Sequence, residues 1–225
     1  MDTYDTLVAR RKSCRICMEK DHGKIHNGAE FDFDPTVVSY WSQWLGHQKP
    51  KVLVVGQDFG SVGYFTEPTH RGTDDTESVT NQNLRELLHH AGISVGNPPT
   101  FDESAPVFLT NSILCLKEGT MKSAVKTRWV DACAKKHLSP LAEYLRAPIV
   151  VSMGSHAWRA TRTLFHLSAA PPKITQAAGS SWLAADGTHV FPVCHCGPLG
   201  VANRQLSKQV ADWQRIGVAV RELGP

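Results

Sequence analysis

Four short apolar runs rich in β-branched residues limit the folds open to this chain more than any other feature of its sequence. Such runs are typical of strands buried on both faces of a parallel sheet. The expected strands are 51–56, 107–110, 149–154 and 189–193, and the expected helices are 80–91, 126–145 with a break before Pro140, 155–165 and 203–223. The alternation predicts an α/β fold: a three-layer α/β/α sandwich around a central, mainly parallel four-stranded sheet, with functional residues at the C-terminal ends of the strands.

Length and composition narrow the class of protein. The 225 residues suffice for one domain with its own core, so we expect a single domain over 1–225. No apolar run is long enough to cross a membrane, and the first residues lack the basic start and apolar stretch of a secretory signal. These features predict a cytoplasmic protein with no membrane partner. The net charge of +3 is too small to indicate a nucleic-acid-binding protein by itself.

The segment 1–50, ahead of the first strand, has features of its own. Cys14 and Cys17 form a C-x-x-C pair, and the aromatic stretch 40–45 is predicted to form a helix that packs on the core. In a reducing compartment, cysteines serve as core thiols, metal ligands or nucleophiles rather than disulfides. Further along, two long polar segments, 60–80 and 92–106, are expected to be functional or mobile loops.

Polar side chains follow the first two predicted strands. The first strand runs into Gly56-Gln57-Asp58-Phe59-Gly60, which places a carboxylate between two glycines that let a ligand approach the backbone. The alternative is a tight turn with a capping aspartate. The second strand ends at Asn111, whose amide can offer a donor and an acceptor to one planar partner, although asparagine is also common in turns.

The other two strand ends carry a glycine turn and a histidine. Residues 153–156 open a helix whose first amides could hold a phosphate. The fourth strand is followed by His195 and a loop rich in glycine and proline, and the alternative is that this histidine is structural. Cys194 and Cys196 flank it and are expected to pack in the core, both on the face opposite His195.

In this order, the motifs resemble those of the uracil-DNA glycosylase superfamily. Gly56-Gln57-Asp58 is similar to its water-activating motif, and 108–111 to the strand with the asparagine that reads uracil. Residues 195–200 resemble its histidine loop and keep the histidine, one proline and the leucine. The resemblance implies the α/β/α fold of that superfamily. It also implies a monomeric enzyme that removes uracil, or another deaminated base, from DNA.

The resemblance assigns roles around the scissile bond. Asp58 would orient or deprotonate the attacking water and favour a cationic sugar, and Asn111 would hydrogen-bond the uracil edge. A neutral His195 would donate to the uracil carbonyl that gains charge. Gly56 and Gln57 would line the base pocket. An aromatic residue should stack on the base, and the sequence leaves three candidates, which could equally be core residues: Phe59, Tyr64 and Phe65.

The resemblance also implies contacts with a flipped-out nucleotide. Leu199, beside Pro198 at the loop tip, would fill the gap left in the base stack. The amides of Gly197 and Gly200 and the guanidinium of Arg204 would hold the flanking phosphates. The expected partner is therefore DNA that contains a deaminated base.

The cysteine spacing is similar to that of the iron-sulfur branch of the superfamily. That branch has two cysteines before the first strand, one just after the asparagine strand and one in the next helix. The resemblance implies a [4Fe-4S] cluster bound by four thiolates. Core packing, for the last two cysteines, and a structural zinc site made of all four are the alternatives. The matching residues are Cys14, Cys17, Cys115 and Cys133.

Departures from the family pattern keep other functions open. Gly60 stands where another branch has the tyrosine that excludes thymine, and Gln57 stands where the iron-sulfur branch has glutamate. The histidine loop lacks both serines, which removes two phosphate contacts. One alternative is a catalytically weak nucleic-acid-binding protein with a structural iron-sulfur or zinc site. A more distant one is a hydrolase of small nucleosides or nucleotides.

Overall fold

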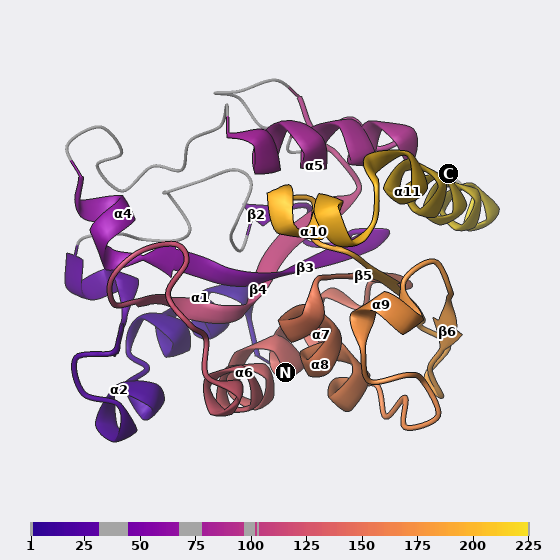
Figure 1. Ribbon diagram of the computed structural model, residues 1–225. Helices are drawn as coiled ribbons and strands as arrows, with labels where there is room; N and C mark the ends of the chain where they lie inside the picture. Colours follow the sequence, from indigo (N-terminus) through magenta and orange to yellow (C-terminus); the bar gives the residue numbers. More distant parts are fainter. Residues whose placement is uncertain (1, 32–44, 68–77, 97–101, 103, 225) are drawn as a thin grey trace.

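The computed structural model describes residues 2–31, 45–67, 78–96, 102 and 104–224, which form a mostly parallel sheet with helices on both faces (Figure 1). The sheet has seven strands in the order β1-β4-β3-β5-β7-β6, and β2 also pairs with β4. The predicted α/β class is confirmed. The strands are β1 Ile25–His26, β2 Leu45–Gly46, β3 Val52–Ser61, β4 Val107–Lys117, β5 Ile149–Met153, β6 Trp182–Leu183 and β7 His189–Val193.

The four expected strands are β3, β4, β5 and β7, and neighbouring members pair in parallel. The predicted total of four strands is wrong, because β1 and β2 pair antiparallel with β4, and β6 pairs antiparallel with β7. Each added strand has only two residues. Strands this short cannot show the two-residue alternation by which a sequence reveals a strand.

Strands β3 and β4 extend well beyond their apolar runs. The two remain paired past Gly56 and Asn111, to Ser61 and Lys117, with a register shift between Asp58 and Gly60. Irregularities of this kind are common next to active sites, where they re-aim side chains. Asp58 and Asn111 therefore lie within paired strands, and not in the turns that the sequence also allowed.

Helices cover both faces of the sheet and pack on it in two large buried clusters. Helices α5 and α11 lie on one face, and α6, α7 and α8 lie on the other (Figure 1). The helices are α1 Tyr4–Lys12, α2 Ile16–Lys20, α4 Val62–Thr66, α5 Val79–His90, α6 Thr127–Cys133, α7 Ser139–Leu145, α8 Ser155–Leu164, α9 Ile174–Ala177, α10 Pro198–Asn203 and α11 Leu206–Glu222, together with the 3₁₀ turn η1 Gly28–Phe31 and the π-helical turn η2 Ala134–Leu138.

The break predicted before Pro140 does not occur. Helix α6, the π-helical turn η2 and helix α7 follow one another without a loop. Pro140 lies two residues after η2, and the run stays helical through it although the proline cannot donate a backbone hydrogen bond. Turns of π-helix are often found at functional sites, and η2 begins directly after Cys133.

Some expectations fall on residues that the structure does not describe. The helix predicted over 40–45 lies outside the described residues, apart from Leu45, which begins β2. Of the loop 60–80, the described parts belong to β3, α4 and α5 or lie directly next to them, and 68–77 are outside. In the described part of the chain, we find no helix with the length and apolar character needed to span a membrane.

Candidate functional site

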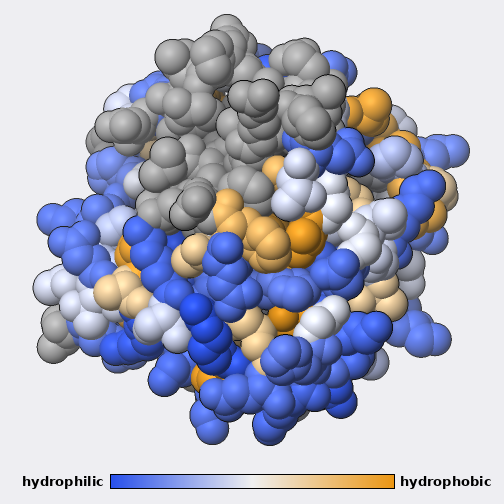
Figure 2. All heavy atoms as spheres, turned by 90° about the vertical axis from the view of Figure 1, so that its left-hand side faces the viewer, coloured by the Kyte–Doolittle hydropathy of each residue, from blue (hydrophilic) through white to orange (hydrophobic). Residues whose placement is uncertain are grey.

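A pocket of about 370 Å³ lies where β3 and β4 extend and β5 and β7 end. Six of its lining residues are among those predicted for the site: Gly56, Gln57, Asp58, Tyr64, Asn111 and His195. Figure 2 looks at the molecule from the side of α4, where β3 ends, and shows apolar side chains gathered at the centre of a mostly hydrophilic face. The fold thus brings three distant sequence motifs to one cavity at the C-terminal side of the sheet.

Asp58 is held by two donors in this pocket. Gln57 Nε2 donates to Asp58 Oδ2 at 2.8 Å, and Lys117 Nζ donates to the same oxygen at 2.9 Å. The carboxylate and the ammonium are both nearly buried, with 6% and 4% of their side chains exposed. The sequence prediction missed Lys117, because it ended the second strand at residue 110. The available signal was a single lysine directly after the apolar run 113–116.

Asn111 lies beside Gly56 on the neighbouring strand. A Cβ atom at position 56 would come within 2.3 Å of Asn111 Oδ1, so the glycine makes room for the amide. Asn111 is only 5% exposed and lines the pocket. Ser112 Oγ donates to the carbonyl of Gln57 at 2.6 Å, which joins the two strands at the level of the site.

His195 is neutral, and its hydrogen bonding fixes which nitrogen carries the proton. The backbone N–H of Gly197 donates to His195 Nδ1 at 2.9 Å. Because a backbone N–H can only donate, Nδ1 is the acceptor and the proton is on Nε2. Burial lowers the pKa of His195, and the charge of Asp58 opposes this shift only in part. The pocket therefore contains an imidazole that can donate from Nε2 at neutral pH.

The histidine loop depends on its glycines for close packing. A Cβ atom on Gly200 would lie 1.7 Å from the carbonyl oxygen of His195, and one on Gly197 would lie 2.8 Å from Thr80 Oγ1. Pro198 is exposed in the first turn of α10. Next to it, Leu199 is 83% exposed, so its side chain is available to a partner.

Arg204 is already engaged within the protein. Its Nε and Nη2 donate to Asp212 Oδ2 and Oδ1 at 2.5 and 2.7 Å, and the Asp212 side chain is only 2% exposed. This pair links the end of α10 to α11. We therefore no longer assign Arg204 to phosphate binding, because releasing it would leave a buried carboxylate with only Arg215 as an ionic partner.

The three aromatic candidates have different environments. Tyr64 lines the pocket. Phe65 is 1% exposed and packs with Leu116 in a separate small core cluster, so it is a core residue. The side chain of Phe59 lies outside the described residues. Tyr64 is thus the stacking candidate that the described pocket supports.

The four cysteines assigned to a cluster line a second cavity. Cys14 lies between α1 and α2, Cys17 in α2, Cys115 in β4 and Cys133 at the end of α6. The space between the thiols is small, about 10 Å³, and in the described part no three side chains of the ligand-forming types are arranged to hold a metal ion.

Burial keeps three of these thiols, those of Cys17, Cys115 and Cys133, protonated in the absence of a cation. It raises the pKa of Cys17 to about 11 and that of Cys133 to about 12, and it raises the pKa of Cys115 well above the usual value. Repulsion between the neighbouring thiolates adds to each shift. A bound cation would offset that repulsion, so the chemistry of the donor set suits a thiolate-ligated metal group.

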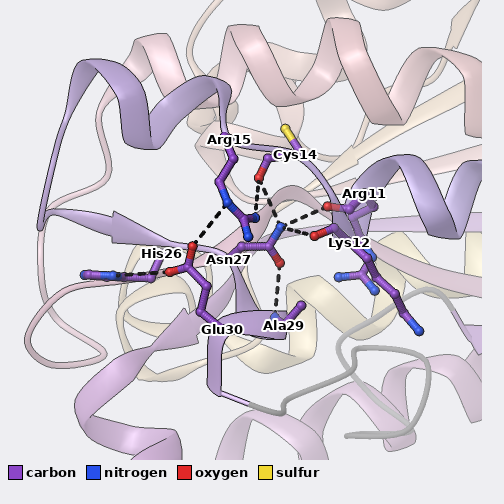
Figure 3. A network of polar contacts seen from close by, with 8 residues as sticks. All are labelled: Arg11, Lys12, Cys14, Arg15, His26, Asn27, Ala29 and Glu30. Atoms are coloured by element: carbon purple, nitrogen blue, oxygen red, sulfur yellow. Dashed lines mark hydrogen bonds and ion pairs between the residues drawn. The ribbon is translucent and has the colours of Figure 1, made fainter.

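Asn27 holds the backbone of the first cysteine, Cys14, in place. This buried amide donates from Nδ2 to the carbonyls of Arg11, Lys12 and Cys14 at 2.9–3.1 Å (Figure 3). Its Oδ1 accepts from the N–H of Ala29 at 3.1 Å. The bonds fix the turn between α1 and α2, and with it the position of the Cys14 backbone.

Asp21, just after α2, fastens the same segment to α6. Its carboxylate accepts from Arg128 Nε and Trp129 Nε1, both at 2.7 Å, and also pairs with Lys126. Only 4% of the Asp21 side chain is exposed. Since α6 ends at Cys133, this contact brings cysteines far apart in the sequence to one cavity.

We expect Asp21→Asn to lower the melting temperature at pH 7 by about 5 °C. The hydrogen bonds from Arg128 hold the pKa of this carboxyl well below its usual value. A lowered pKa stabilises the fold above the unfolded value near pH 4, and the gain is lost as pH falls further. The melting temperatures of the two proteins should therefore begin to converge as the pH falls below about 4.

Asp131→Asn is the matched control for this change. It removes one exposed ion pair, that of Asp131 with Arg159, whose side chains are 48% and 50% exposed. Exposed pairs contribute little to stability. Equal effects of the two substitutions at pH 7 would contradict the role given to Asp21.

His137 is a residue of the cysteine cavity that the sequence prediction missed. It is 3% exposed in η2, and within the described residues neither ring nitrogen has a hydrogen-bond partner. Burial lowers its pKa to about 4, so the ring is neutral and carries one N–H. An unpartnered donor beside four thiols fits a cavity built to surround a further group.

The two remaining cysteines are buried but on opposite faces of the sheet. Cys194 belongs to the core cluster beneath α6 and α8, and Cys196 to the cluster beneath α5 and α11. Both cysteines thus pack in the core, as predicted. The expectation that both lie on the face opposite His195 is wrong. In an extended strand, residues 194 and 196 would point to the same face, because side chains alternate. Strand β7 ends at Val193, so this alternation does not continue through the two cysteines.

Comparison of the sequence with protein-family models gives no match, and comparison with curated proteins gives none either.

Proposed function

We propose that this protein is a monomeric DNA glycosylase that hydrolyses the N-glycosidic bond of uracil, or of a related deaminated base. One observation carries the proposal: a carboxylate, an amide and an imidazole with its proton on Nε2 all line a single pocket at the C-terminal side of a parallel sheet. This combination supplies each group that the reaction needs. It also agrees with the resemblance of the motifs to the uracil-DNA glycosylase superfamily.

Two of these groups act on the base. Asn111, buried beside Gly56, offers an acceptor and donors to the edge of a planar base. His195 donates from Nε2 to the base carbonyl that becomes negatively charged as the bond breaks. A neutral imidazole suits this task, because it stabilises the anion without having to transfer its proton. Tyr64 provides the stacking surface.

Asp58 acts on the sugar and the water. The leaving of the base makes the sugar cationic, and a nearby carboxylate stabilises that charge. Gln57 and Lys117 both hold Oδ2, which orients the carboxylate before substrate binds. The other oxygen of Asp58 then orients the attacking water and accepts its proton.

DNA would reach the pocket with the target nucleotide flipped out. The exposed Leu199 would enter the gap in the base stack, and the amide near Gly200, in the first turn of α10, would contact the flanking backbone. The amide of Gly197 already donates to His195 Nδ1, so we do not assign it to a phosphate. The engagement of Arg204 by Asp212 removes one expected phosphate contact. We therefore propose moderate affinity for undamaged DNA.

The four-cysteine cavity would hold the cofactor. We assign Cys14, Cys17, Cys115 and Cys133 as its ligands, with a [4Fe-4S] cluster as the first candidate and zinc as the second. The group would cross-link the N-terminal segment to β4 and α6. Its role there is structural, since the reacting pocket is lined by other residues.

The test is excision from labelled oligonucleotides that carry one uracil, hypoxanthine or xanthine, single-stranded and in duplex. We expect uracil DNA to yield alkali-labile abasic sites, and a matched thymine oligonucleotide to stay intact. Retardation of all these DNAs in a gel without excision would overturn the enzymatic proposal in favour of a binding protein. Cleavage of free deoxyuridine alone would point instead to a nucleoside hydrolase.

A further inference from the structure

Lys117 lines the pocket, but the proposed mechanism uses its amine only to hold Asp58. Its amine lies 2.9 Å from Asp58 Oδ2, its side chain is 4% exposed, and it lines the same cavity as Asn111 and His195. The register shift between β3 and β4, at Asp58 and Gly60, lies directly beside it, at the level of Leu116. A lysine at the end of a buried strand is thus directed into the reaction pocket.

Fold stability is a poor explanation for this pair. Taking an ammonium and a carboxylate out of water costs free energy that their mutual attraction recovers only in part, so apolar side chains would serve a purely structural role as well or better. Gln57 already holds the same carboxylate oxygen at 2.8 Å. Orientation of Asp58 therefore does not depend on Lys117 alone, and the amine is available for chemistry.

A lysine amine and a carboxylate form a competent pair for imine chemistry. An amine becomes nucleophilic when a neighbouring base removes its proton in a site with little water, and it then condenses with aldehydes. The product of the proposed glycosylase is such an aldehyde, because an abasic deoxyribose opens to a free carbonyl at C1′. The pocket that makes this product also contains the amine.

We propose that Lys117 is a second reactive group of the pocket, which forms a Schiff base with C1′ of an abasic site in DNA and cleaves the strand. The inference rests on the proposed function, in that the pocket must accept a flipped deoxyribose. It adds a lyase activity to the hydrolase. Lys117 would act as the nucleophile and Asp58 as the group that takes up and returns protons.

The proton and electron balance closes with these two residues and water. Asp58 takes a proton from Lys117, whose free amine adds to the C1′ carbonyl. Asp58 returns the proton to the departing hydroxyl, so that water leaves and an iminium joins Nζ to C1′. The carboxylate then removes a C2′ proton, and the 3′ phosphate leaves with the electron pair of the C3′–O bond. Hydrolysis of the imine releases the unsaturated sugar and restores the amine.

The test uses DNA in which the abasic site already exists. The full-length protein is mixed with an oligonucleotide whose single uracil has been removed beforehand by an unrelated glycosylase, in the presence of sodium borohydride. Reduction of the imine should give a covalent protein–DNA adduct on a denaturing gel, and omission of borohydride should give a strand break. Peptide mapping of the wild-type adduct should place the modification on Lys117.

Two lysine variants provide the comparison. Lys117→Arg keeps the charge beside Asp58 but removes the condensing amine, so adduct formation should fall at least about tenfold. Lys122→Arg changes an exposed lysine five residues away and should leave it unchanged. Absence of an adduct with the wild type, an undiminished adduct in Lys117→Arg, or a mapped site elsewhere would each overturn the proposal.

The outcome is separable from that of the uracil test. An adduct with preformed abasic DNA, but no excision of uracil, would support the lyase and reject the proposed glycosylase. Excision of uracil without any adduct would support the glycosylase and reject the lyase.

Discussion

Asp58→Asn should lower the single-turnover rate of uracil excision about a thousandfold, while leaving DNA binding within about threefold. Asparagine has nearly the same shape as aspartate, and its carbonyl can still accept from Gln57 and Lys117. What the substitution removes is the negative charge, which both stabilises the cationic sugar and accepts the proton of the attacking water. The rate and the affinity should be measured separately, by quenched reactions and by fluorescence anisotropy.

The substitution also leaves the buried ammonium of Lys117 without its counter-ion, which destabilises the fold. The double variant Asp58→Asn, Lys117→Met separates this effect from catalysis, because it removes both charges. We expect its melting temperature to rise above that of Asp58→Asn and its excision rate to stay low. Asp131→Asn, on the exposed surface, is the control for both measurements. An Asp58→Asn rate within a few-fold of wild type would remove Asp58 from the mechanism.

The central sheet was predictable because its strands carry their own signal. Runs such as 51–56 and 149–154 are buried on both faces, and their β-branched residues record that burial locally. Beyond the predicted strands, the extensions of β3 and β4 have no such run of β-branched residues in the sequence. Gln57 and Asp58 are poor strand formers, and they stay extended because pairing with the neighbouring strand overrides local preference.

The sequence predicted the site residues that belong to a recognisable motif. It did not predict the residue that is identified only by a contact in the folded structure. Asp58, Asn111 and His195 lie in short motifs at strand ends, and all three line the pocket. Lys117 is assigned only by its distance to Asp58, which lies 59 residues away in the sequence. That contact depends on a register shift that no local pattern encodes.

Arg204 shows the opposite error. A basic residue at the end of a glycine-rich loop suggested a phosphate contact, but its partner is Asp212, eight residues later. Asp212 is a carboxylate next to Trp213 on the buried face of α11. A buried acidic residue requires a cationic partner. The position of Asp212, one residue before a core tryptophan, was therefore the signal that Arg204 is paired within the protein.

The cysteine cavity leads to the second large effect. The protein purified without oxygen should be brown and contain iron and sulfide, and Cys115→Ser and Cys133→Ser should each lose most of both. Serine leaves the size of the side chain nearly unchanged but does not supply the thiolate that holds iron. Cys196→Ser is the matched control, because Cys196 is also buried but lies in the core cluster on the other face of the sheet.

Loss of the group should loosen a defined part of the molecule. Cys14 and Cys17 are held to the rest of the fold by Asn27, by Asp21 and, under this proposal, by the cluster. In Cys133→Ser, limited proteolysis should therefore cut first within the N-terminal segment, at a rate at least about tenfold above that of Cys196→Ser. A colourless protein with one zinc ion per chain, lost in the same variants, would show that these cysteines form a zinc site. Metal-free wild type with an equally resistant N-terminal segment would show that the four thiols only pack.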